Sequence, residues 1–145
     1  MNDSSIANSS LNASTLDTSM SSVSDKKKKS LDDFEVVEGK TGQLGKGSFA
    51  TVKLVKEKEN PNKLYAMKII NKKDVFEHSS PEYLKREIKV HKKLDHPHIV
   101  KLKHYFEDKE NVYLVMEYAE HGNLFYYIRR KKRLLEKEAF IYFFQ

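Results

Sequence analysis

The sequence contains no cysteine. This absence excludes disulfide bonds, cysteine-ligated zinc sites, iron–sulfur clusters and a thiol nucleophile. No run approaches the roughly 18 consecutive apolar residues of a membrane-spanning helix, and residues 1–5 have neither the basic end nor the apolar run of a signal peptide. Asn2 stands where N-myristoylation requires glycine. We therefore expect an intracellular protein, in the cytoplasm or the nucleus, with no membrane partner.

The 145 residues leave room for one domain of ordinary size. The hydrophobic content of 39% is enough for a packed core, and the 33% charged residues indicate a well-hydrated surface. The net charge is +6, from 27 basic and 21 acidic residues. Charges mixed in this way are typical of an ordinary protein surface, so we expect no nucleic-acid partner. Nothing in the sequence indicates the oligomeric state.

Residues 1–30 contain ten serines and two threonines, with apolar residues at no sustained period. Such a segment cannot bury enough apolar surface to offset its ordering entropy. We predict a disordered Ser-rich and Lys-rich tail over residues 1–33. The run Lys26–Lys29 within it is interpreted as part of a solvated linker, with a nuclear-import or acidic-surface patch as the alternative.

From Phe34 onward, β-branched and aromatic residues form short segments that are broken by Gly, Asn-Pro and acidic turns. This pattern is typical of strands and hairpins. It predicts five strands, at residues 34–44, 51–57, 64–70, 99–106 and 112–118.

A helix is predicted between the third and fourth of these strands. Ser79 followed by Glu82 forms a capping box, and Pro81 suits a first helical turn. Two further helices are predicted, at residues 124–130 and from near residue 135. The main helix runs to about residue 94, with its inward positions at helical spacing: Leu84, Ile88, His91 and Leu94.

Gly45 and Gly47 stand at a spacing that lets backbone N–H groups approach phosphate oxygens. A dinucleotide-binding fold requires a helix after the glycines, but residues 51–56 are strand-like. A Walker loop requires Ser or Thr after its lysine, but Gly47 follows Lys46. Among phosphate-binding loops, only a hairpin that lies over a nucleotide fits. An ordinary glycine hairpin is the alternative.

Lys68 lies inside a predicted strand, where alternation places it on one face with Ala66 and Ile70. An interior ammonium requires an anionic neighbour, unless it extends to solvent at a strand edge. Glu87 falls on the inward stripe of the predicted helix, where a carboxylate is equally out of place. We predict a buried Lys68–Glu87 ion pair, in which the lysine donates to phosphate and the glutamate fixes its direction.

In this order, the glycine hairpin, the strand lysine and the helix glutamate resemble the N-terminal lobe of a eukaryotic protein kinase. The resemblance covers about 112 residues, from Phe34 to the end of the chain. Residues 95–100 and 112–119 are similar to the family's link and hinge. Residues 45–50, 87–91 and 105–108 resemble the Aurora and polo-like serine/threonine groups, which implies a centrosome or spindle location.

The resemblance implies an α+β fold, a five-stranded antiparallel sheet with one main packed helix. It implies a lobe with its hinge over residues 34–119, and the first helices of a truncated C-terminal lobe over residues 120–145. ATP is the implied cofactor, and protein serine or threonine is the implied substrate. The implied nucleotide-binding residues are Leu44, Gly45, Lys46, Gly47, Val52, Ala66, Lys68, Glu87, Met116 as gatekeeper, and Glu117 and Ala119 through their main chain.

The chain departs from the family pattern in three ways. Ala50 replaces the third glycine of the hairpin, and residues 37–43 are about four residues longer than usual, through a bulge or a splicing error. No H-R-D, D-F-G or A-P-E motif is present, so no catalytic residue and no metal ligand is expected within these residues. We expect a truncated and inactive chain, with Mg²⁺ used only in a full-length parent. The alternative is a non-catalytic nucleotide-binding or scaffold module.

Overall fold

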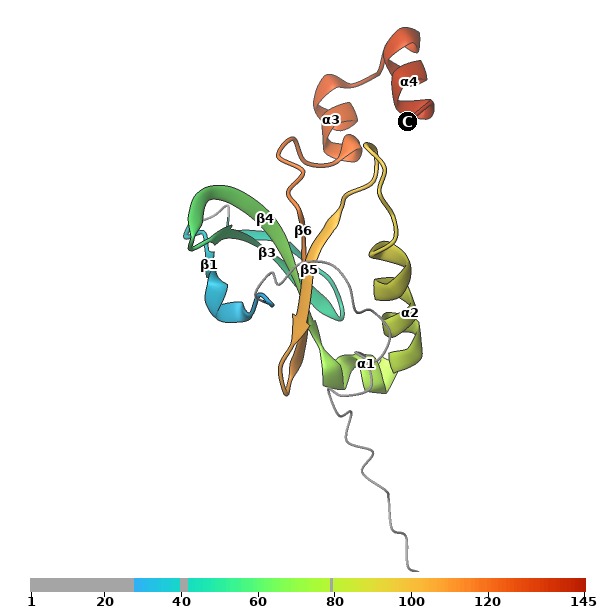
Figure 1. The fold of residues 1–145 in the computed structure, drawn as a ribbon. Coiled ribbons are helices and arrows are strands. Elements are labelled where there is room, and N and C mark those ends of the chain that lie inside the picture. The colour runs from blue at the N-terminus through green and yellow to red at the C-terminus, as the bar shows by residue number, and fades with distance from the viewer. Residues whose placement is uncertain (1–27, 40–41, 79) are drawn as a thin grey trace, which may run out of the picture.

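The computed structural model describes residues 28–39, 42–78 and 80–145. Within them, the chain forms a six-stranded antiparallel sheet and four α-helices, so the predicted α+β fold is confirmed (Figure 1). The sheet order is β1-β3-β4-β6-β5, and β2 also pairs with β3. The strands are β1 Phe34–Val36, β2 Gln43–Lys46, β3 Ala50–Glu57, β4 Asn60–Asn71, β5 Leu102–Glu107 and β6 Asn111–Glu117.

The first predicted strand is divided into β1 and β2 by a bulge. The Val37 N–H donates to the Leu54 carbonyl at 3.0 Å, and the Leu54 N–H donates to the Gly42 carbonyl at 2.9 Å. Val37 and Gly42 therefore oppose the same residue of β3. A Cβ on Gly42 would lie 2.2 Å from the Val37 carbonyl oxygen, so only glycine fits there.

The helices are α1 Lys72–His78, α2 Pro81–His91, α3 Leu124–Lys131 and α4 Glu136–Phe143. Sequence reasoning did not predict α1. Ser80 is the N-cap of α2, whereas Ser79, which we predicted as the cap, lies outside the described residues. Helices α3 and α4 contain no buried residue and lie beyond one end of the sheet (Figure 1). None of the helices in the described part of the chain has the length and apolar character needed to cross a bilayer.

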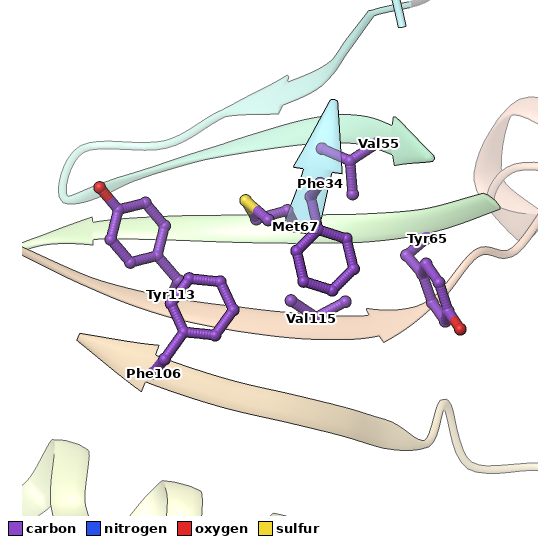
Figure 2. Packing of buried hydrophobic residues seen from close by; sticks show 7 residues of the cluster. All are labelled: Phe34, Val55, Tyr65, Met67, Phe106, Tyr113 and Val115. Carbon is purple, nitrogen blue, oxygen red and sulfur yellow. The ribbon is translucent and has the colours of Figure 1, made fainter. Parts of the chain in front are cut away.

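The two faces of the sheet carry separate hydrophobic clusters. On one face, Phe34 stacks on Phe106 and meets Tyr65 edge to face (Figure 2). The remaining members of that cluster are Val55, Met67, Tyr113 and Val115. The cluster on the other face consists of Ile70, Val75, Leu102, Val112 and Leu114.

Helix α2 lies against the second cluster, beside β5 in Figure 1. Its side chains Leu84 and Ile88 pack on that cluster, but no residue of the helix is buried. Its C-terminal end is tied to the sheet more firmly. There, the His91 ring nitrogen Nε2 lies 2.7 Å from the Val100 carbonyl oxygen, and the Lys92 ammonium lies 4.3 Å from the centre of the Tyr105 ring.

Candidate functional site

A cavity of about 290 Å³ lies where β6 leaves the sheet and continues into the link to α3. This volume is near the lower end of the range for small-molecule pockets, roughly 300 Å³. Its lining is mainly apolar, with side chains from β2, β4 and β6. The lining residues are Leu44, Ala66, Val100, Met116, Glu117, Tyr118, Ala119, Glu120 and Gly122.

Five of the predicted nucleotide-binding residues line this cavity. The roles that we assign to them stay predictions. They are Leu44, Ala66, Met116, Glu117 and Ala119.

Strand pairing aligns three of the other six predicted residues in a row next to the cavity. In the sheet, Gly45 pairs with Val52, and Val52 pairs with Lys68. The adjacent row contains Ala66 paired with Met116, both of which line the cavity. Two residues of strand span about 6.6–6.8 Å and return the side chain to the same face. Lys68 therefore follows Ala66 on one face of β4, just outside the cavity.

The glycine hairpin connects β2 to β3 and is closed by a hydrogen bond from the Gly47 N–H to the Ala50 carbonyl at 2.8 Å. Among the described residues, a Cβ placed on Gly45 would meet nothing within 4 Å, and one on Gly47 would meet only the Ala50 carbonyl oxygen, at 3.6 Å. Packing within the protein thus does not require glycine at either position. The space beside both residues is open to a ligand, and Lys46 between them is exposed.

The predicted contact between Lys68 and Glu87 is present, but the prediction that it is buried is wrong. The Lys68 Nζ lies 3.8 Å from the Glu87 Oε1, while 33% of the lysine side chain and 60% of the glutamate side chain are exposed. The reason is that the apolar side chains of α2 that pack on the sheet cluster are Leu84 and Ile88, and no residue of the helix is buried, which leaves the neighbouring position 87 at the solvent border. The Lys68 ammonium is consequently accessible to an anion.

The link after β6 provides main-chain groups at the cavity. The Gly122 N–H donates to the Ala119 carbonyl at 3.1 Å, and this turn requires a left-handed φ of 73° at Gly122, which favours glycine. Within residues 28–39, 42–78 and 80–145, the Ala119 N–H donates to no acceptor. A donor beside an apolar cavity can bind the edge of a heteroaromatic ring.

Sequence reasoning missed four cavity residues. Tyr118, Glu120 and Gly122 belong to the link, and the His121-Gly122-Asn123 turn was a usable signal for that position. Val100 lines the cavity from the loop after α2, where its carbonyl oxygen lies 2.7 Å from the His91 ring nitrogen Nε2. No local pattern in the sequence reveals such a contact. The part of the chain that the structure describes has no group of three His, Asp or Glu side chains arranged to hold a metal ion.

Comparison with known proteins agrees with this geometry. The family model of the protein kinase domain matches residues 39–145. The chain is 40% identical over 116 residues to an Aurora kinase of Yarrowia lipolytica, a match that covers 80% of this chain and 30% of that protein.

Two further relatives extend the comparison. A probable myosin light chain kinase of Dictyostelium discoideum is 48% identical over 97 residues, which cover 67% of this chain and 29% of that protein. The serine/threonine-protein kinase PLK2 of Mus musculus is 39% identical over 99 residues, or 68% of this chain and 14% of that protein. The chain thus spans less than a third of the length of these relatives. The resemblance to the Aurora and polo-like groups is confirmed, and the chain belongs to the protein kinase family.

Proposed function

We propose that this chain is the ATP-binding portion of a serine/threonine protein kinase. The observation that carries the proposal is the position of the accessible Lys68 ammonium. Lys68 lies two residues after Ala66 on β4, on the face that borders the apolar cavity. An apolar cavity with a cation at one side fits a purine attached to phosphates. This combination favours a nucleoside triphosphate over an uncharged ligand.

The adenine ring occupies the cavity between Leu44 and Ala66 on one side and the link on the other. The Ala119 N–H supplies a hydrogen bond to the ring edge, for which it has no competing acceptor among the described residues. Met116 lines the cavity from β6. The adenine base is therefore held by apolar contacts and by a hydrogen bond from the main chain.

The phosphates lie beneath the glycine hairpin, near the row that contains Gly45, Val52 and Lys68. Lys68 donates charge-assisted hydrogen bonds to them, and Glu87 keeps the ammonium directed at that position. The open space beside Gly45 and Gly47 admits phosphate oxygens close to the backbone. The exposed Lys46 adds positive charge to the same region.

In the parent kinase, the γ-phosphoryl group passes from ATP to a serine or threonine hydroxyl of a protein substrate. That transfer requires a catalytic aspartate and Mg²⁺ ligands, which the family places in H-R-D and D-F-G motifs. Neither motif occurs in these 145 residues. The chain by itself therefore binds ATP without transferring phosphate. The resemblance to Aurora and polo-like kinases favours an intracellular setting for the parent.

Calorimetric titration with ATP and with adenosine tests the proposal on the wild-type chain and on Lys68→Met. A Lys103→Met variant is the control, because this lysine is exposed on β5. Loss of a hydrogen bond to a charged group weakens ATP binding about tenfold or more in Lys68→Met, while adenosine binding is unchanged. Equal ATP affinity in all three proteins would contradict the role of Lys68. Absence of binding by either ligand would favour a scaffold module instead.

A further inference from the structure

The segment before β1 is fastened to the hairpin between β3 and β4, so the predicted disorder of residues 1–33 is wrong for residues 29–33; residues 1–27 lie outside the described residues. We call residues 29–33 the strap. The Lys29 Nζ lies 2.9 Å from the Glu57 Oε1 and 2.6 Å from the Glu59 Oε2. The Lys58 N–H donates to the Asp33 carbonyl at 2.9 Å. Glu57 is 8% exposed, so its carboxylate depends on Lys29 for a cation.

Ser30 sits inside the strap and is held by one carboxylate. Its N–H donates to the Asp33 Oδ2 at 2.7 Å, and its Oγ donates to the same oxygen at 3.1 Å. Asp33 in turn donates its N–H to the Ser30 carbonyl at 3.2 Å. The serine is exposed and has an extended backbone, with φ −128° and ψ 176°. Its hydroxyl is therefore accessible to an enzyme once the strap lifts.

The sequence before Ser30 is basic at four consecutive positions, Lys26–Lys29. No other serine or threonine of the chain follows three consecutive basic residues. An acidic substrate groove in a serine kinase recognises such a run by charge complementarity. We infer that Ser30 is a phosphorylation site for a kinase that selects basic residues before its acceptor, and that phosphorylation releases the strap from the sheet.

ATP is the phosphoryl donor for the modification of Ser30. The Ser30 Oγ forms a bond to the γ-phosphorus, the bond from that phosphorus to the β–γ bridging oxygen breaks, and ADP leaves. The hydroxyl proton passes to the base of the acting kinase. Because the strap holds Ser30 through Asp33 and Lys29, only the lifted strap can enter that enzyme's active site.

The phosphate then prevents the strap from docking again. It carries about −1.5 to −2 charges and replaces the hydroxyl donor that lies 3.1 Å from the Asp33 carboxylate. It also competes with Glu57 and Glu59 for Lys29. Phe34, which is 6% exposed and directly follows the strap, loses the anchor on its N-terminal side. This inference does not depend on nucleotide binding by the chain.

Limited chymotrypsin digestion of the full chain measures the release, after treatment with Mg-ATP and a purified basophilic serine kinase. Mass spectrometry locates the phosphate and quantifies cleavage after Phe34. Cleavage after Phe125, which is 66% exposed, provides the internal reference. We expect phosphate on Ser30 and a rise of roughly fivefold or more in cleavage after Phe34. Unphosphorylated Lys29→Ala gives a similar rise, and kinase-treated Ser30→Ala gives none.

Two outcomes would overturn the inference. Phosphate found only on serines other than Ser30, or on none, removes the site. Phosphate on Ser30 with an unchanged rate of cleavage after Phe34 removes the release, even if the modification itself occurs. Because wild-type protein is compared before and after treatment, a folding defect in either variant does not obscure the result.

Discussion

Lys68 and Glu87 approach each other from β4 and α2 at 3.8 Å, with both side chains open to solvent. An exposed pair of this length gains little Coulomb energy, because water screens it and both side chains lose rotamer freedom. The pair therefore contributes to the direction of the lysine more than to the stability of the fold. We therefore propose that the role of the pair is to direct the Lys68 ammonium toward a bound phosphate.

A double-mutant cycle tests the weakness of this pair. For Lys68→Ala, Glu87→Ala and the double variant, we expect a coupling free energy of unfolding below about 1 kcal/mol. Urea unfolding without nucleotide is the measurement. A coupling of 2 kcal/mol or more, on the order of that for a desolvated pair, would show that the two charges are buried together in solution.

Substitutions at Gly42 and Gly45 distinguish effects on stability from effects on ATP binding. We expect Gly42→Ala to destabilise the protein by about 2 kcal/mol or more, because its Cβ would lie 2.2 Å from the Val37 carbonyl oxygen. Gly45→Ala has open space for its methyl group and changes stability by less than about 1 kcal/mol, but weakens ATP binding. Thermal unfolding and ATP titration of both variants check this. Equal stability of the two variants would contradict the bulge geometry.

Met67 is the largest fully buried side chain of the cluster beneath Phe34 (Figure 2). We expect Met67→Ala to cost about 2–5 kcal/mol of unfolding free energy, through lost burial and the cavity left behind. Leu64→Ala, on the same strand but 41% exposed, is the matched control and costs less than about 1 kcal/mol. Comparable losses from both substitutions in urea unfolding would argue against the packing of this face.

His104 makes the stability of the fold depend on pH. Burial lowers the pKa of His104 below its ordinary value of 6.5, and Lys29, Lys63 and Lys103 lower it further against the opposing charge of Glu57. Below pH 6.5 the unfolded chain takes up a proton that the folded protein resists, so the contribution of His104 to stability falls as the pH drops toward its folded pKa.

The variant His104→Gln removes this contribution. We expect its melting temperature to decrease less between about pH 7 and about pH 5.5 than that of the wild type. His121→Gln, at an exposed position in the link, is the control and retains the wild-type slope. An identical slope in all three proteins would show that His104 titrates normally in the fold.

Local patterns in the sequence predicted most of the sheet. Period-two alternation placed Ala66, Lys68 and Ile70 on one face, and the structure pairs Ala66 and Lys68 with Met116 and Leu114 of β6. The main helix was predicted from its Leu84 and Ile88 stripe, and both residues pack on the sheet. These features depend on neighbours in sequence, which explains why they could be predicted.

Features set by tertiary contacts could not be predicted in this way. Helix α1 has only seven residues and one buried apolar residue, Val75, so no helical period develops. Its position is fixed by Lys72, whose Nζ lies 2.7 Å from a carboxylate oxygen of Glu107. The exposure of Glu87 likewise depends on how deeply α2 sits against the sheet, which helical spacing alone does not determine.

Labelling with an acyl-phosphate derivative of ATP tests whether Lys68 lies at the ATP phosphates, because this reagent acylates the lysine that lies beside the bound phosphates. Mass spectrometry then identifies the modified residue among all the lysines of the chain. We predict selective labelling of Lys68. Excess ATP abolishes this labelling, whereas a buffer of equal ionic strength without ATP leaves it unchanged. Labelling spread evenly over surface lysines, or a Lys68 signal that excess ATP does not reduce, would contradict the proposed contact between Lys68 and the ATP phosphates.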